Sequence, residues 1–496
     1  MKKTLALILL ITFIFSFGSL AFAQTAEQAP APAATEEKTA EQIAAEKQAA
    51  EEEAAKKAEE EAKAAAAAAK KAKDAKITLV VLAVAAFFFI TELIPLAITA
   101  MSVPVILILT KVLTAAQGFA GLQDSNVVLF AGMFVVGASL FETGVAKAIG
   151  DKVVGMAGGS EIGLTAGVFI LAAGLSSVLS NTGTTAVLLP VCIGIANSAG
   201  WNRGRILMPL ALAAGLGGTL SLVGTPPNLV VNGVLGTAGL EQFGFFEFAL
   251  AGGPMTIAGG IYLLTIGRRL IPDRKVEDDG STPAADENKV HNKTHQMISI
   301  VILLIVVIVM AFGKKLPGML NMPLHVASTI GALACVLTGI VKEKQAYRSI
   351  DWTTIFLFAG MLPLASAMNS TGAGKMIADM VVGALGENPS PFVIMSAMFW
   401  LTSILTQFMS NTASTTLLAP ICLAIADGIG ASPQAILMVV AMAASCAFAT
   451  PVGTPPNTLV LGPGGFKFND YIKVGVPLLV ICYAVLMVVA PIFWPL

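Results

Sequence analysis

Long apolar segments recur along the chain from Ile77 onward, each about twenty residues long and separated by short polar stretches. A helix of this length crosses a hydrocarbon core roughly 30 Å thick. The segments do not alternate strictly between apolar and polar positions, as strands of a membrane barrel would. The pattern therefore predicts an all-α polytopic membrane protein.

The residues before this region have a different pattern. Residues 1–23 contain two lysines, an apolar run and small residues before Gln24, which is typical of a secretory signal peptide. The apolar run is also long enough to remain as an uncleaved anchor. Residues 24–75 are mostly Ala, Glu and Lys, a composition that favours a solvated helix or disorder. A coiled coil is the weaker interpretation, because its seam would consist of alanine.

Composition and charge agree with a membrane location. The chain is 56% hydrophobic and only 12% charged, whereas about a quarter of a soluble domain is charged. Its net charge of −1 predicts no nucleic-acid partner. Lys and Arg concentrate in loops that alternate to one side, among them Arg203, Arg268 and Lys342. The positive-inside rule places these loops in the cytoplasm of a bacterium and the N-terminal tail outside its inner membrane.

The membrane region contains two related halves. "LFAGM" begins at Leu129 and again at Leu357, and "SNT" begins at Ser180 and again at Ser410. "VGTPPN" likewise occurs twice, at residues 223–228 and 452–457. We assign residues 76–266 to the first repeat, 267–296 to a polar cytoplasmic loop and 297–496 to the second repeat.

Each half is predicted to hold five full crossings and one hairpin, so the second copy would be upside down. Such inverted-topology repeats are typical of secondary transporters, which bind their substrate near the midplane between the repeats. A duplicated bundle without a transport role is the alternative, and the polar character of the duplicated motifs argues against it.

The SNT motifs interrupt apolar segments at 162–197 and 391–427, each too long for a single span. We predict two half-helices that meet at a polar tip, which makes a re-entrant hairpin. Irregular backbone at membrane depth is tolerated only where it is buried or lines a cavity. Because Ser, Asn and Thr are N-cap residues, each tip would present free backbone N–H groups and a positive helix end to an anion.

The second motif of each half contains two consecutive prolines, at 226–227 and 455–456. Proline cannot continue a helix, and the residue before it is pushed out of the helical conformation. The motif therefore predicts an unwound helix whose carbonyl groups, such as those of Gly224 and Gly453, could coordinate a cation. Packing between membrane helices explains either motif alone, but two such pairs favour a binding site.

The charge around these motifs indicates the kind of ligand. No Lys or Arg occurs between Ser160 and Trp201, or between Phe392 and Gly465. Neutral donors can orient carboxylates but cannot neutralise a dianion, which favours cation-coupled symport with Na⁺. A neutral substrate would fit the lack of charge equally well. Neither an enzyme motif nor a channel filter is recognisable, and a membrane sensor would need a soluble sensing domain.

These paired motifs, with "TELIPL" at Thr91, resemble those of the divalent-anion:sodium symporter family over about residues 77–496. The resemblance implies a homodimer in which a transport domain moves like an elevator against a scaffold. It also implies substrate contacts from six residues: Asn181, Thr182, Asn411, Thr412, Thr454 and Pro455.

The resemblance further implies two sodium sites. The first would use Ser176, Ser180, Asn181 and Gly224, and the second Thr406, Asn411 and Gly453 with the main chain near Met409. Ser176 and Thr406 each lie four residues before an SNT serine and keep an oxygen-bearing side chain, which supports a symporter over an exchanger. The family's first membrane helix is replaced here by the signal-like segment and the tail.

The sequence thus predicts a sodium-coupled importer of C4-dicarboxylates such as succinate, malate or fumarate. Symport of sulfate or tricarboxylates and sodium-independent dicarboxylate exchange are the alternatives, because the SNT pair alone does not set the length of the ligand.

Overall fold

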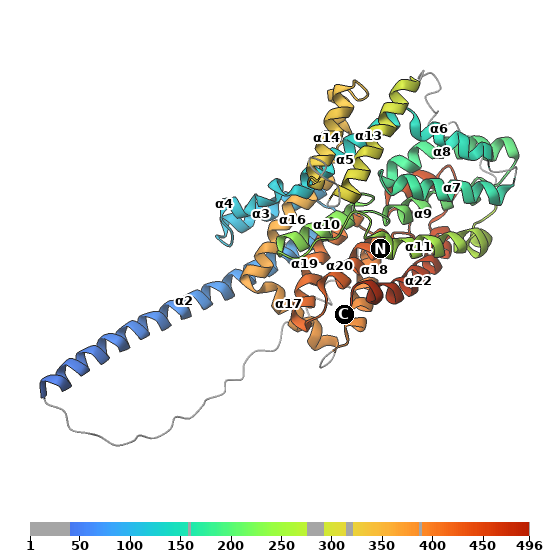
Figure 1. The fold of residues 1–496 in the computed structure, drawn as a ribbon. Coiled ribbons are helices and arrows are strands. Elements are labelled where there is room, and N and C mark those ends of the chain that lie inside the picture. The colour runs from blue at the N-terminus through green and yellow to red at the C-terminus, as the bar shows by residue number, and fades with distance from the viewer. Residues whose placement is uncertain (1–39, 157–159, 275–291, 314–320, 386–388, 496) are drawn as a thin grey trace.

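The computed structural model describes residues 40–156, 160–274, 292–313, 321–385 and 389–495, and all regular elements in these ranges are helices (Figure 1). Eight of the described helices are long and apolar enough to cross a membrane. The prediction of an all-α polytopic protein is therefore confirmed. The signal-like segment, residues 24–39 of the tail and most of the polar loop at 267–296 lie outside the described residues.

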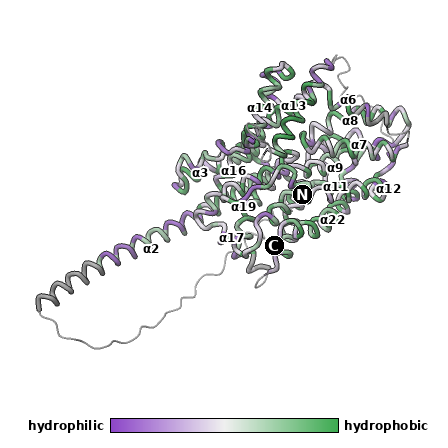
Figure 2. Tube along the Cα trace, in the orientation of Figure 1, coloured by the Kyte–Doolittle hydropathy of each residue, from purple (hydrophilic) through white to green (hydrophobic). Residues whose placement is uncertain are grey.

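The tail and the first membrane helix form one continuous helix, α2 (Ala40–Thr91). Side chains 55–73 are exposed, and burial begins at Ala75, which is 2% exposed. The part before Ala75 projects from the helical body for about 50 Å at roughly 1.5 Å per residue (Figures 1 and 2). The predicted boundary at 75/76 coincides with the start of burial rather than with a helix end.

After α2 the chain forms two series of helices in the same order. Three short elements lead into the first series: α3 (Leu96–Leu109), α4 (Ala115–Gly118) and η1 (Ala120–Gln123). The first series comprises α5 (Ser125–Glu142), α6 (Val145–Met156), α7 (Glu161–Ser176), α8 (Asn181–Ala199), α9 (Gly204–Gly218), α10 (Pro226–Thr237) and α11 (Ala249–Tyr262). A π-helical turn, η2 (Leu263–Gly267), and α12 (Arg268–Leu270) end it.

Three helices lead into the second series, as the end of α2, α3 and α4 lead into the first: α13 (Lys293–Phe312), α14 (Leu324–Leu337) and α15 (Glu343–Ser349). The second series comprises α16 (Trp352–Thr371), α17 (Ala373–Leu385), α18 (Pro391–Thr406), α19 (Asn411–Ile429), α20 (Pro433–Ser445), α21 (Pro455–Leu461) and α22 (Phe468–Phe493).

Equivalent residues begin and end equivalent helices in the two series. Ser180 is the N-cap of α8, and Ser410 is the N-cap of α19. The same helices end at Gly200 and Gly430, whose φ angles of 68° and 67° are left-handed and suit only glycine well. The two copies of the sequence motif therefore produce the same local structure.

The pieces of the broken helices bind the two series together. Helices α9 and α20 run through the centre and are almost entirely buried. Helix α10 packs against α16, α19 and α20, whereas α21 packs against α8 and α9. Each series thus places the second piece of its broken helix against the SNT helix of the other.

Apolar side chains on the periphery mark a surface that faces lipid. On α13, Leu304, Ile305 and Ile308 are each at least 50% exposed. In water such a contiguous apolar face would be unfavourable, but a bilayer solvates it.

Deleting residues 24–70 should leave the membrane unit intact, because the described side chains removed from α2 are all exposed. We expect the melting temperature in detergent to change by less than about 2 °C. A deletion extended to residue 78 would also remove Ala75 and Thr78, which are 2% and 0% exposed. This longer deletion should lower the melting temperature clearly. Equal destabilisation by both deletions would show that the projecting helix contacts the membrane unit.

Candidate functional site

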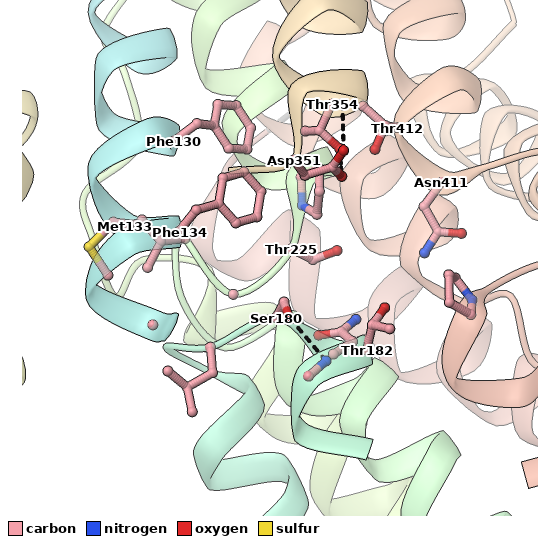
Figure 3. Close-up of a pocket in the computed structure, with 18 of the residues that line it drawn as sticks. Phe130, Met133, Phe134, Ser180, Thr182, Thr225, Asp351, Thr354, Asn411 and Thr412 are labelled. Atoms are coloured by element: carbon pink, nitrogen blue, oxygen red, sulfur yellow. Dashed lines mark hydrogen bonds between the residues drawn. The ribbon is translucent and has the colours of Figure 1, made fainter. Parts of the chain in front are cut away.

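A cavity of about 430 Å³ lies where the two series meet. Both SNT tips and both Gly-Thr-Pro-Pro turns contribute to its wall (Figure 3). All six residues that the sequence assigns to substrate binding line it: Asn181, Thr182, Asn411, Thr412, Thr454 and Pro455. The fold thus brings into one cavity residues that are up to 274 positions apart in the chain, from Asn181 to Pro455.

Each SNT tip is the start of a helix that points at the cavity. The Ser180 Oγ accepts a hydrogen bond from the Gly183 N–H at 3.0 Å, and the Ser410 Oγ accepts one from the Ala413 N–H at 3.1 Å. The other N–H groups of the first turn have no partner within the helix. Both 19-residue helices, α8 and α19, therefore present a positive end to the cavity.

The asparagine of each Thr-Pro-Pro-Asn motif holds the unwound turn before it. The Asn228 Nδ2 donates to the carbonyl oxygens of Ser221 at 2.7 Å and Gly218 at 3.3 Å. In the second series, the Asn457 Nδ2 donates to those of Thr450 at 2.9 Å and Ala447 at 2.8 Å. These bonds satisfy carbonyl groups that the helix break leaves unpaired, at a depth where water does not replace them.

Oxygen atoms gather behind the first tip. One end of the Asn181 amide lies 2.5 Å from the Ser176 Oγ, 3.1 Å from the Ala214 carbonyl oxygen and 3.2 Å from the Gly224 carbonyl oxygen. Three oxygens around this end assign it to the amide nitrogen, which donates to them. A Cβ at Gly224 would approach the Gly218 carbonyl oxygen to 2.5 Å, so this close packing of backbone requires glycine.

A similar cluster lies behind the second tip. The Thr406 Oγ1 lies 2.8 Å from the Asn411 Oδ1 and 2.7 Å from the Ala444 carbonyl oxygen. Gly453 packs against the Thr406 backbone, and Met409 is buried in the turn between α18 and α19.

The residues assigned to sodium therefore fall into two groups. Ser180, Asn181, Gly224, Asn411 and Gly453 line the cavity. Ser176, Thr406 and Met409 lie behind the tips, and all three are buried.

Helices α5 and α16 supply a cavity wall that sequence reasoning missed. Phe130, Met133 and Phe134 of α5 and Leu357 of α16 line it. The rings of Phe130 and Phe358, which occupy the same position in the two LFAGM motifs, meet edge to face with centroids 5.6 Å apart. The repetition of LFAGM was the available signal, but nothing in the motif itself indicates a cavity wall.

Gln407 was also missed, and it connects the second tip to the unwound turn after α20. Its Nε2 donates to the carbonyl oxygens of Ser403 at 2.8 Å and Cys446 at 3.0 Å, while its Oε1 accepts from the Ala449 N–H at 2.8 Å. Its own carbonyl oxygen accepts from the Thr450 Oγ1 at 2.6 Å. A side chain that is 6% exposed thus has its amide fully paired.

The first series has no counterpart of this amide. Ser177 occupies the equivalent position, and its Oγ donates within its own helix to the Gly174 carbonyl oxygen at 2.7 Å. Only its backbone carbonyl reaches the unwound turn, where it accepts from the Ser221 Oγ. The second turn is therefore held by more side-chain hydrogen bonds than the first.

Comparison with known proteins agrees with this architecture. A family model described as "Citrate transporter" matches residues 86–441 and 417–496, which is most of the chain. The chain belongs to the citrate transporter family. The predicted relationship to the divalent-anion:sodium symporters is thereby confirmed, and the protein is a secondary transporter rather than an enzyme.

Its curated relatives are also transporters. An uncharacterized transporter of Escherichia coli is 28% identical, with 84% of this chain and 98% of the relative covered. A sodium-dependent dicarboxylate transporter of Staphylococcus saprophyticus, SdcS, is 26% identical, with 81% of this chain and 83% of the relative covered.

Among solved structures, MtrF of Neisseria gonorrhoeae, from a class described as antimetabolite efflux pumps, superposes with a TM-score of 0.57 at 16% identity. The match covers 79% of this chain and 84% of MtrF. The YdaH transporter of Alcanivorax borkumensis superposes with a TM-score of 0.54 at 15% identity, with 78% of this chain and 88% of YdaH covered. At these identities the likeness shows a shared fold.

Replacing Gln407 with Ala should destabilise the protein by about 2–3 kcal/mol, because it leaves the buried Ala449 N–H without its partner and removes one of the two hydrogen bonds to the Cys446 carbonyl. Thermal unfolding in detergent would measure the effect. Ser177→Ala is the matched control in the first series and should cost less than about 1 kcal/mol, since it removes a bond within one helix. Equal melting temperatures for the two variants would contradict a holding role for Gln407.

Proposed function

We propose that this transporter is a sodium-coupled symporter that imports C4-dicarboxylates such as succinate, malate or fumarate across the bacterial inner membrane. The observation that carries the proposal is that both SNT tips line the same cavity. Its volume of about 430 Å³ lies within the range of roughly 300–1,000 Å³ that is usual for small-ligand pockets. The dicarboxylate relative supports the choice of substrate.

The two tips suit the two ends of a dicarboxylate. Asn181 and Thr182 offer an amide, a hydroxyl and the N–H groups of α8, and Asn411 and Thr412 offer the same groups at the start of α19. Helix N-termini of this kind attract and orient carboxylates. Each carboxylate would meet one tip, with Thr454 and Pro455 beside the second.

The oxygen clusters behind the tips suit Na⁺. At the first tip the Asn181 amide nitrogen lies among the Ser176 hydroxyl and the Ala214 and Gly224 carbonyl oxygens. A sodium ion there would replace the nitrogen as the positive partner, and the amide would turn its oxygen toward the ion. The unwound backbone beside each tip is the usual source of sodium ligands in transporters of this kind.

Sodium binding would therefore precede substrate binding and order the tips. It would also neutralise part of the dianion's charge in a cavity whose described wall contains neither Lys nor Arg. If more than two Na⁺ accompany each dianion, import moves positive charge inward. Each such charge gains about 2.3 kcal/mol per 100 mV of inside-negative potential.

We further propose that the hairpins and broken helices move together as an elevator, within a homodimer of two inverted-repeat protomers. The reciprocal packing of α10 on α19 and α20, and of α21 on α8 and α9, supports one moving unit. Ion pairs brace its periphery: Arg274 bonds Asp470 at 2.5 Å, and Arg268 lies 3.2 Å from Glu161. Helices α5 and α16 would remain with the scaffold.

The deciding experiment is uptake of labelled succinate into proteoliposomes with and without an inward Na⁺ gradient. Unlabelled sulfate, citrate and malate serve as competitors. We expect sodium-driven uptake that malate blocks. Uptake that requires internal dicarboxylate but no Na⁺ would instead identify an exchanger, and competition by sulfate or citrate alone would change the substrate class.

Asn181→Ala and Asn411→Ala should each abolish sodium-driven uptake, because each removes an amide from a tip and from the oxygen cluster behind it. Asn197→Ala is a matched control: it lies on α8 with Asn181, but outside the cavity. Both tip variants should still elute from size exclusion as the wild type does. Full uptake in either of them would refute the site.

Ser176→Ala and Thr406→Ala should raise the sodium concentration needed for half-maximal uptake about five- to tenfold, since each removes one oxygen ligand worth roughly 1 kcal/mol. Thr406→Ser keeps the hydroxyl and should stay close to wild type. A change in maximal rate without a change in sodium dependence would argue against a cation at these positions.

A further inference from the structure

One charged side chain lines the cavity. Among the described residues of its wall, Asp351 is the only acidic residue, and neither Lys nor Arg joins it. It is exposed and makes no ion pair within 4 Å in the described part of the chain. A cavity proposed to bind a dianion therefore carries a charge of the same sign in its own wall.

Asp351 belongs to α16 rather than to a hairpin. It is the N-cap of that helix: its Oδ1 accepts from the Thr354 N–H at 3.2 Å, and its Oδ2 accepts from the Thr354 Oγ1 at 2.6 Å. Figure 3 shows Asp351 and Thr354 beside Thr412 at one end of the cavity, with Ser180 at the other. Capping explains the presence of an acid, but Asn would cap equally well without a charge.

The chain around Asp351 indicates the side to which this end of the cavity belongs. In the preceding helix, α15, Lys344 and Arg348 are exposed. Under the positive-inside rule these residues lie on the cytoplasmic side. Neither forms an ion pair with Asp351 within 4 Å, so no described basic side chain offsets this carboxyl group directly.

We propose that Asp351 lowers the affinity for the dianion at the cytoplasmic face and thereby promotes release into the cell. Like charges a few ångströms apart in a hydrated cavity repel each other measurably. The repulsion acts only while the tips lie beside α16, because the hairpins move and α16 does not. The inference rests on the proposed function. The repulsion makes binding of the dianion weaker at the cytoplasmic face than at the outer face.

Asp351→Asn tests this directly, because Asn retains the cap and the size of the side chain while removing its charge. Labelled succinate exchange would be measured in right-side-out and inside-out vesicles that contain the full chain. We expect the KM at the cytoplasmic face to fall about fivefold, a difference of about 1 kcal/mol. The KM at the outer face should stay unchanged, and high salt should reduce the difference.

Asp124→Asn is the matched control. Asp124 caps α5, the helix equivalent to α16, and its Oδ1 accepts from the Asn126 N–H at 2.8 Å. It does not line the cavity, so its variant should leave both KM values unchanged. If Asp351→Asn folds poorly, Asp351→Ser replaces it, because Ser also caps the helix without a charge. We expect the same fall in the cytoplasmic KM.

The outcomes separate this inference from the function on which it rests. A wild-type protein without sodium-driven dicarboxylate uptake would overturn the proposed function itself. If the wild type transports but Asp351→Asn leaves the cytoplasmic KM unchanged, the repulsion is absent. A rise in that KM would mean that Asp351 attracts a bound cation instead, which also overturns the proposal. An equal fall at both faces would contradict the restriction to one conformation.

Discussion

Backbone polar groups in the middle of a bilayer need partners, and the two broken helices of this protein show how that need shapes a binding site. Where α9 and α20 end, the carbonyl groups of the unwound turns are satisfied by the side chains of Asn228 and Asn457. Those bonds stabilise irregular backbone at a depth where water cannot. Because the turns are held open in this way, Gly224 and Gly453 can lie beside the SNT tips, and a cavity is left between them.

Local features of this site were predictable from the sequence. Consecutive prolines predicted the helix breaks before α10 and α21. The SNT motifs predicted N-caps, and Ser180 and Ser410 are the N-caps of α8 and α19. Contacts between distant residues were not predictable in the same way. The pairing of Gln407 with Cys446 and Ala449 depends on how two helices cross. The unbroken course of α2 through residue 75 has a local cause: Ala, Lys and Glu are strong helix formers, and nothing there stops the helix.

The two halves share a design but differ where side chains hold the unwound turns. The Gln407 amide fixes the turn after α20 with two hydrogen bonds, to Cys446 and Ala449, whereas the Ser177 side chain at the equivalent position bonds only within its own helix. The first turn depends more on Asn181, whose amide fills the space among three oxygens. The two oxygen clusters, which arise from the same motif, are thus held by different numbers of side-chain hydrogen bonds, so under the proposed function their sodium affinities need not be equal.

The charge of the cavity wall bears on the proposed coupling to sodium. The tips contribute dipoles and neutral donors, which can orient carboxylates without neutralising them, and the described wall contains one acidic residue, Asp351, and no basic one. Under the proposed function, a dianion in this cavity is repelled by Asp351, and bound cations offset that repulsion. Coupling of the two solutes then has an electrostatic basis: the dianion alone adds two negative charges to a cavity whose wall has no basic side chain among the described residues, whereas dianion and sodium together add little net charge.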